Sequence, residues 1–177
     1  MKTIVSRLGK TIELRVPQFG DEEQLAKFIN GLVDEEAPIL INQQQTRQEE
    51  KIYLGEAIER VDKKLRVQYL SFYEEKLVAN CQVDKGRFRE ERVGTFGISV
   101  VKEHRGDGIG FQLARQVIDE ARKKLGIYLV QLNVYAGNEK ALGLYRKLGF
   151  IEYGRLPRAI AYKQRFVDRV HMYLALE

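Results

Sequence analysis

One stretch, in which an apolar run passes through three glycines into a helical pattern, constrains this chain more than any other. Residues 98–111 read Ile-Ser-Val-Val-Lys-Glu-His-Arg-Gly-Asp-Gly-Ile-Gly-Phe. Apolar residues then follow at the spacing of one buried helix face: Ala114, Val117, Ile118, Ala121 and Leu125. A strand, a glycine turn and a helix in this order bring unpaired N–H groups and the positive end of a helix dipole together. The stretch is therefore predicted to bind an anion such as a phosphate.

Two common phosphate-binding turns do not fit this stretch. A P-loop needs Lys and Ser or Thr where Phe111 and Gln112 stand. A dinucleotide fingerprint needs Gly-x-Gly-x-x-Gly, whereas residues 106–110 read Gly-Asp-Gly-Ile-Gly. The pattern Arg-x-x-Gly-x-Gly from Arg105 to Gly110 does fit a known family, because it resembles the acetyl-CoA pyrophosphate loop of the GCN5-related N-acetyltransferases (GNAT family).

Length, charge and cysteine content narrow the class of protein. At 177 residues the chain is expected to form a single domain, residues 1–177. The net charge of +5 suits an anionic ligand, and the lack of a basic block disfavours nucleic acid. The single cysteine, Cys81, excludes an internal disulfide and favours a reducing compartment. Residues 1–10 lack the apolar core of a signal peptide and no run is long enough to span a membrane, so a cytoplasmic protein without membrane contact is expected.

Periodicity predicts the order of the elements. Alternation predicts a first strand over residues 11–16, and helices are expected after Asp21 and Thr46, each with a capping-box spacing. A hairpin is predicted over residues 65–83, with Cys81 as a core residue on its apolar face. The remaining expected elements are strands over residues 93–101 and 127–135, a helix from Asn138 to Gly149, a strand from Phe150, a basic loop over residues 157–164 and a last strand over residues 166–176.

This order, β-α-α-β-β-β-α-β-α-β-β, defines the predicted fold class. The helix between the strands on either side of residues 102–126 implies one parallel pair in an otherwise antiparallel sheet. We therefore predict an α+β fold with a mixed, mostly antiparallel sheet flanked by helices. The order resembles the GNAT acyl-CoA N-acyltransferase fold over residues 10–177, in which the parallel pair is splayed at the acetyl-CoA site.

A second signature lies in residues 133–150, Asn-Val-Tyr-Ala-Gly-Asn-Glu-Lys-Ala-Leu-Gly-Leu-Tyr-Arg-Lys-Leu-Gly-Phe. It resembles the family's Asn…Ala-x-x-x-Tyr-x-Lys-x-Gly-Phe run. From periodicity alone Tyr145 is a core aromatic, whereas the resemblance implies a general acid for the departing thiolate. Asn138 is a helix N-cap that the resemblance also places against the pantetheine arm. Lys147 is either a solvated lysine or a phosphate contact.

The resemblance implies that acetyl-CoA is the co-substrate, with its pantetheine arm in the gap between the parallel strands. It implies no metal and one catalytic residue, Tyr145. The residues implied for cofactor binding are Ile98, Ser99, Val100, Arg105, Gly106, Asp107, Gly108, Ile109, Gly110, Phe111, Asn138, Tyr145 and Lys147.

The implied activity is direct transfer of the acetyl group to a primary amine, which is a small-molecule amine, a polyamine, an amino acid, or a protein N-terminus or lysine. Many members carry glutamate where this chain has Thr95, so no base is assigned. The proton is expected to leave through ordered water or before the amine binds. His104 is interpreted as a solvated loop residue. The missing glutamate favours an alternative, a catalytically inactive acetyl-CoA-binding sensor or scaffold, and Tyr145 opposes it.

The resemblance places the acceptor pocket between the loop over residues 35–45 and the loop over residues 156–165. The first loop offers Glu35 and Glu36 for a cationic amine. The second offers basic side chains for a carboxylate: Arg155 just before it, and Arg158, Lys163 and Arg165 within it. The sequence leaves both the acceptor and the oligomeric state open, a homodimer included.

Overall fold

The computed structural model describes residues 2–176, so Met1 and Glu177, the ends of the predicted domain, lie outside the described residues. The strands are β1 (Lys2–Val5), β2 (Thr11–Arg15), β3 (Arg66–Tyr73), β4 (Lys76–Lys85), β5 (Val93–Val100), β6 (Leu129–Tyr135), β7 (Ile151–Tyr162) and β8 (Arg165–Ala175). The helices are α1 (Glu22–Asp34), α2 (Arg47–Asp62), α3 (Ile109–Leu125) and α4 (Glu139–Lys147), with short 3₁₀ turns η1 (Phe88–Glu90) and η2 (Lys102–His104).

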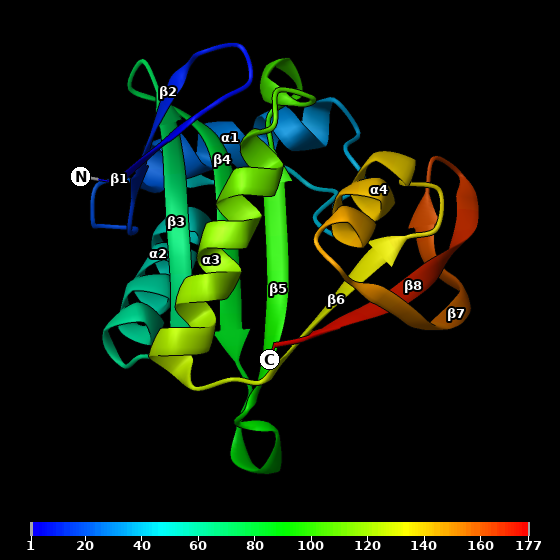
Figure 1. Ribbon diagram of the computed structural model, residues 1–177. Coiled ribbons are helices and arrows are strands. Elements are labelled where there is room, and N and C mark those ends of the chain that lie inside the picture. Colours follow the sequence, from blue (N-terminus) through cyan, green and yellow to red (C-terminus); the bar gives the residue numbers. More distant parts are fainter. Residues whose placement is uncertain (1, 177) are drawn as a thin grey trace.

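The strands form one sheet in the order β1-β2-β3-β4-β5-β6-β8-β7, and β5–β6 is its parallel pair within residues 2–176. Figure 1 shows α3 across one face of the sheet and α1 and α2 behind the other, with α4 beside β6. The predicted α+β class, mostly antiparallel with one parallel pair, is confirmed.

Each face of the sheet buries its own apolar cluster. The predicted inner face of α3 is buried as expected, in the cluster that also contains Cys81. Cys81 is fully buried, and this burial raises the pKa of its thiol. The other cluster lies under α1 and α2, where Leu32, Leu54 and Leu70 are almost completely buried. Full burial of one such leucine contributes about 1.5–3 kcal/mol to folding.

Strand β1 was not predicted, and the basic loop over residues 157–164 was predicted wrongly. β1 has four residues, and only Ile4 among them is buried. So short a segment with one buried position shows no periodicity in the sequence that would indicate a strand. The expected loop is instead continuous β7, which turns at Lys163 and Gln164 into β8. Pro157 is tolerated in β7 for two reasons. It lies where the ladder with β8 is irregular, between Leu156 and Ile160, and β7 is an edge strand with no further strand to bond.

The two predicted capping boxes have different outcomes. Thr46 and Glu49 form the reciprocal bonds of the box at the start of α2. The box expected at Asp21 does not form, because its carboxylate is engaged by Arg15 and accepts the Gln18 N–H at 2.9 Å. Tertiary partners thus replace the local cap.

Candidate active site

The two parallel strands separate soon after they meet. Their ladder runs only from Val93↔Leu129 to Thr95↔Gln131, and Figure 1 shows β5 and β6 diverging beyond it. A cleft of about 910 Å³ lies along this divergence, lined by both strands, by α1, α2 and α4 and by the loop between α1 and α2.

The backbone of β5 presents to this cleft hydrogen-bonding groups that no neighbouring strand pairs. The Val101 N–H donates to the Val78 carbonyl at 3.0 Å, which fixes the phase of the β4–β5 ladder. Since residues of an antiparallel strand alternate between facing their partner and facing away, Ile98 and Val100 direct their N–H and C=O groups toward the cleft. Ser99 directs its backbone toward β4 instead. The strand therefore offers an edge with which an extended ligand can pair.

The glycine turn follows as expected and delivers the start of α3 to the cleft. Gly106 and Gly108 have φ of +83° and +81°, which glycine adopts without strain. No side chain within residues 2–176 caps α3 at its N-cap Gly108, so its first N–H groups remain available for an anion. A Cβ on Gly110 would make only ordinary contacts, the nearest at 3.6 Å, so this glycine leaves room rather than permitting an unusual backbone.

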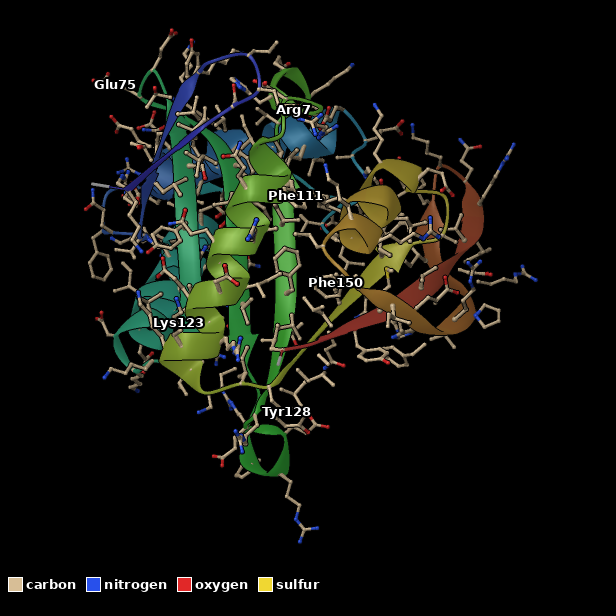
Figure 2. The ribbon with its side chains drawn as sticks, in the orientation of Figure 1. Arg7, Glu75, Phe111, Lys123, Tyr128 and Phe150 are labelled. Atoms are coloured by element: carbon tan, nitrogen blue, oxygen red, sulfur yellow. The ribbon has the colours of Figure 1, made fainter. Side chains whose placement is uncertain are left out.

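Basic side chains surround the turn. The Arg105 Nε donates to the Val100 carbonyl at 2.8 Å, and Lys147 Nζ lies 4.7 Å from the centre of the Phe111 ring. Arg7, from the loop between β1 and β2, lies against Gly108, and Figure 2 shows it above the start of α3. Sequence reasoning missed Arg7, because no signal in the sequence placed this loop beside the turn.

Two predicted cofactor-binding residues have buried side chains that do not line the cleft. Asp107 accepts the Leu8 N–H at 2.8 Å, and its own carbonyl accepts the Arg7 N–H at 2.8 Å. It therefore fastens the β1–β2 loop to the glycine turn. Ile109 is fully buried in the core beneath α3. Either residue can serve a ligand only through its backbone.

Tyr145 is a core aromatic that also reaches the cleft. Its ring is packed edge-on against Phe96, with centroids 6.1 Å apart, and against Phe150 at 5.9 Å. The residue is only 7% exposed yet lines the cleft. Burial, with a smaller contribution from Cys81, raises the pKa of Tyr145 well above its usual value near 10. Its hydroxyl therefore keeps its proton at every physiological pH.

Asn138 caps α4 as predicted and also lines the cleft. Its side-chain oxygen accepts the Ala141 N–H at 3.2 Å. This bond leaves the side-chain amide nitrogen free of the capping role, so capping and ligand contact are compatible.

The loop between α1 and α2 is tied across the cleft. Glu35 forms an ion pair with Arg105, and Glu36 forms one with Lys163, with 3.4 Å between Glu36 Oε2 and Lys163 Nζ. The Tyr135 hydroxyl donates to the Ile39 carbonyl at 2.5 Å. The two carboxylates considered for an acceptor amine are thus already paired with cations.

The remaining base candidates occupy less suitable positions. Thr95 is exposed at the last parallel pair and does not line the cleft. His104 does line it, with its ring 5.4 Å from that of Tyr73. Burial, followed by the nearby charge of Lys10, lowers the pKa of His104.

Among residues 2–176 no three His, Cys, Asp or Glu side chains are grouped as a metal site would require. None of the helices in that range is long and apolar enough to cross a membrane.

Comparison with known proteins places this geometry in context. A model described as the acetyltransferase (GNAT) family matches residues 30–150. The L-methionine sulfoximine/L-methionine sulfone acetyltransferase of Pseudomonas aeruginosa is 32% identical over 80 residues, which are 45% of this chain and 46% of that protein. The spermidine N(1)-acetyltransferase of Vibrio cholerae is 31% identical over 83 residues, 47% of this chain and 48% of that protein. The chain thus matches about half the length of these curated relatives.

The similarity in fold extends further than the similarity in sequence. An acetyltransferase structure from Salmonella typhimurium, solved with its cofactor acetyl-CoA, superposes with a TM-score of 0.81 at 20% identity. The superposition covers 94% of each chain.

Proposed function

Since the chain belongs to the acetyltransferase (GNAT) family, we propose that it is an N-acetyltransferase that moves the acetyl group of acetyl-CoA directly to a primary amine. The observation that carries this proposal is the junction of the splayed β5 edge, the uncapped start of α3 and the Tyr145 hydroxyl in one cleft. Its relatives include enzymes named for acetylating spermidine and methionine derivatives, which agrees with an amine acceptor.

The residues present fit acetyl-CoA. The first N–H groups of α3, with Arg105, Arg7 and Lys147 around them, would hold the pyrophosphate. The backbone groups of Ile98 and Val100 would pair with the amides of the pantetheine arm, which is long and strand-like. When bound, acetyl-CoA supplies an activated acetyl thioester.

The chain's own groups then serve the transfer at three points. The Ile98 N–H, farther from the glycine turn than Val100, is directed at the cleft, where it can polarise the acetyl carbonyl. Tyr145 holds a proton in an apolar site and can give it to the departing sulfur. The cleft also opens toward α1 and α2, on the opposite face of the sheet from α3, which leaves a separate approach for the amine.

We further propose that residues 1–177 form one N-acetyltransferase domain and that it acts in the cytoplasm, as its composition indicates. The test of the activity has two parts. Calorimetry should show acetyl-CoA binding, and mass spectrometry of an amine panel incubated with acetyl-CoA should show a product 42 Da (about one acetyl group) heavier than its amine. Binding without any product would favour the inactive sensor, and no binding would contradict the proposal.

A further inference from the structure

One carboxylate at the cleft differs from all the others near it. Glu35 and Glu36 are paired with cations, and Glu22 on α1 is paired with Arg47 at 2.9 Å. Glu50, in the first turn of α2, lines the cleft and is only 7% exposed. Within residues 2–176 its carboxylate has neither a hydrogen-bond donor nor a cation as partner.

A mostly buried carboxylate without a partner in the protein is unfavourable to the fold. Removing its charge from water is unfavourable unless a cation or hydrogen bonds compensate. Burial, and to a smaller extent the neighbouring charge of Glu49, raises the pKa of Glu50. A residue of this kind in a cleft is a candidate for chemistry, because a bound cationic ligand would supply the missing partner.

The charged groups near Glu50 do not supply that partner. On α2 Glu49 is used in the capping box with Thr46, and from α1 Glu22 is held by Arg47. The basic and imidazole side chains that line the same cleft are Arg7, His104, Arg105, Lys140, Lys147 and Arg169. None of these contributes to the pKa of Glu50.

Glu50 lies on the side of the cleft from which an acceptor would approach. The side chains of Asn80 and Gln82 project from β4 toward the face covered by α1 and α2, on the same side as Ser99. Tyr53, one turn after Glu50, closes this polar strip, and its hydroxyl accepts a hydrogen bond of 3.0 Å from Gln68. Side chains on this strip can orient a polar amine head group.

One wall of the cleft is apolar. It is formed by α1 and the following loop, through Leu25, Phe28, Ile29, Leu32 and residues 37–41. A polyamine would need several free carboxylates. Among residues 2–176 Glu50 is the one acidic side chain that lines this cleft, and the nearby Glu35 and Glu36 are paired with cations. One charge beside a broad apolar wall suits a monoamine with an apolar body.

We infer that Glu50 is the residue that holds the acceptor's ammonium group and takes its proton, and that the acceptor is a primary amine with an apolar body. This inference rests on the proposed function and replaces the shared water relay expected from the sequence. Glu50 accepts one proton from the ammonium group, so the nitrogen lone pair is free to bond to the acetyl carbon. As that bond forms the C–S bond breaks, and the sulfur receives its electrons and a proton from Tyr145. The nitrogen is positively charged after the C–N bond forms and loses a second proton, which restores the Tyr145 hydroxyl. Glu50 releases the first proton, so one proton in net passes to solvent.

The test is Glu50→Gln in the full chain, with Glu56→Gln as the matched control. Glu56 is on the same helix but exposed, so the control removes the same charge away from the cleft. The probes are 2-phenylethylamine and 3-methylbutylamine, with spermidine as a polycation for comparison. Thiol release gives kcat and KM, calorimetry gives the acetyl-CoA Kd, and thermal unfolding gives Tm.

We expect Glu50→Gln to lower kcat/KM for the two monoamines by about 10²-fold or more, with the acetyl-CoA Kd unchanged. Raising the pH toward the amine's own pKa should recover the rate of the variant by up to about tenfold per unit, because more amine then arrives neutral. Its Tm at pH 7 should equal or exceed that of the parent, since an unpaired buried charge is gone, whereas loss of a purely structural residue would lower Tm.

The outcomes separate the two proposals. A parent that neither binds acetyl-CoA nor releases thiol contradicts the acetyltransferase function itself. A parent that is active while Glu50→Gln matches Glu56→Gln overturns only the role of Glu50. A parent that binds acetyl-CoA and acetylates spermidine but neither monoamine overturns the acceptor class inferred here.

Discussion

Tyr145→Phe is the sharpest test of the chemistry proposed for this cleft, because it removes one hydroxyl and keeps the ring. The contacts with Phe96 and Phe150 are made by the ring, so packing worth about 0.5–1.5 kcal/mol for each aromatic pair is retained. We therefore expect the free energy of unfolding to change by less than about 1 kcal/mol at pH 7. The loss should appear in the rate alone.

The size of that loss follows from the role of the hydroxyl. General acid catalysis contributes about 10²- to 10⁴-fold, which corresponds to about 2.7–5.4 kcal/mol of activation free energy. Because the raised pKa of Tyr145 keeps the hydroxyl protonated, no fall in rate from its ionisation is expected in the parent between about pH 6 and 9. The variant should lose kcat by this factor with the acetyl-CoA Kd changed less than about twofold.

Thiol release measures kcat, and calorimetry measures Kd, with Tyr153→Phe as the control. Tyr153 is 56% exposed on β7, so the control removes a tyrosine hydroxyl away from the cleft.

The pH dependence of the free energy of unfolding adds a second readout for Tyr145→Phe. A folded-state pKa above the unfolded one gives stability that is lost as the pH rises beyond about 10, so the parent should lose stability there faster than the variant. A variant with the parent's kcat would refute the acid role and leave Tyr145 a core aromatic.

Three further predictions concern the turn, the stability and the base. Gly110→Val should weaken acetyl-CoA binding at least about tenfold, or 1.4 kcal/mol, by calorimetry, because its methyl groups would enter the cleft beside the uncapped helix start. Burial alone would raise the pKa of Glu120, but hydrogen bonds, led by that from Lys124, lower it to about 2. Glu120→Gln should therefore cost about 1–2 kcal/mol in urea unfolding at pH 7, and this difference should vanish as the pH falls from about 4.5 toward 2. Thr95→Glu should not restore turnover to Glu50→Gln, because Thr95 is exposed outside the cleft, and recovery above a tenth of the parent's kcat would contradict this.

The parts of the fold that were predictable from the sequence are those set by local patterns. The apolar positions of α3 repeat at helical spacing over four turns, and each predicted position is buried. The glycines before α3 could be interpreted because their required backbone conformation is a property of the turn itself. The predicted placement of Asn138 at the start of α4 holds for the same reason, since an N-cap bonds within its own helix.

Features set by distant partners could not be predicted in this way. Asp21 had the sequence of a capping residue, but Arg15 on the preceding strand engages its carboxylate. Arg7 lies beside the glycine turn because Asp107, about a hundred positions later, accepts the Leu8 N–H. No spacing rule links such residues, so the basic side chains around the turn could be listed from the sequence only in part.

Glu50 shows why the acceptor side is the harder half to read. In the sequence it follows Thr46 and Glu49 at the start of a helix, where an acidic residue is explained by the positive end of the helix dipole. The structure gives it a different setting, since α2 covers a part of the sheet where polar side chains such as Asn80 project from β4. Because α2 is only weakly amphipathic and packs over this polar strip, the carboxylate of Glu50 is mostly buried without a partner. A fold retains such an unfavourable burial where a bound ligand supplies the missing partner. For the lone carboxylate of Glu50, that ligand would be a cationic amine.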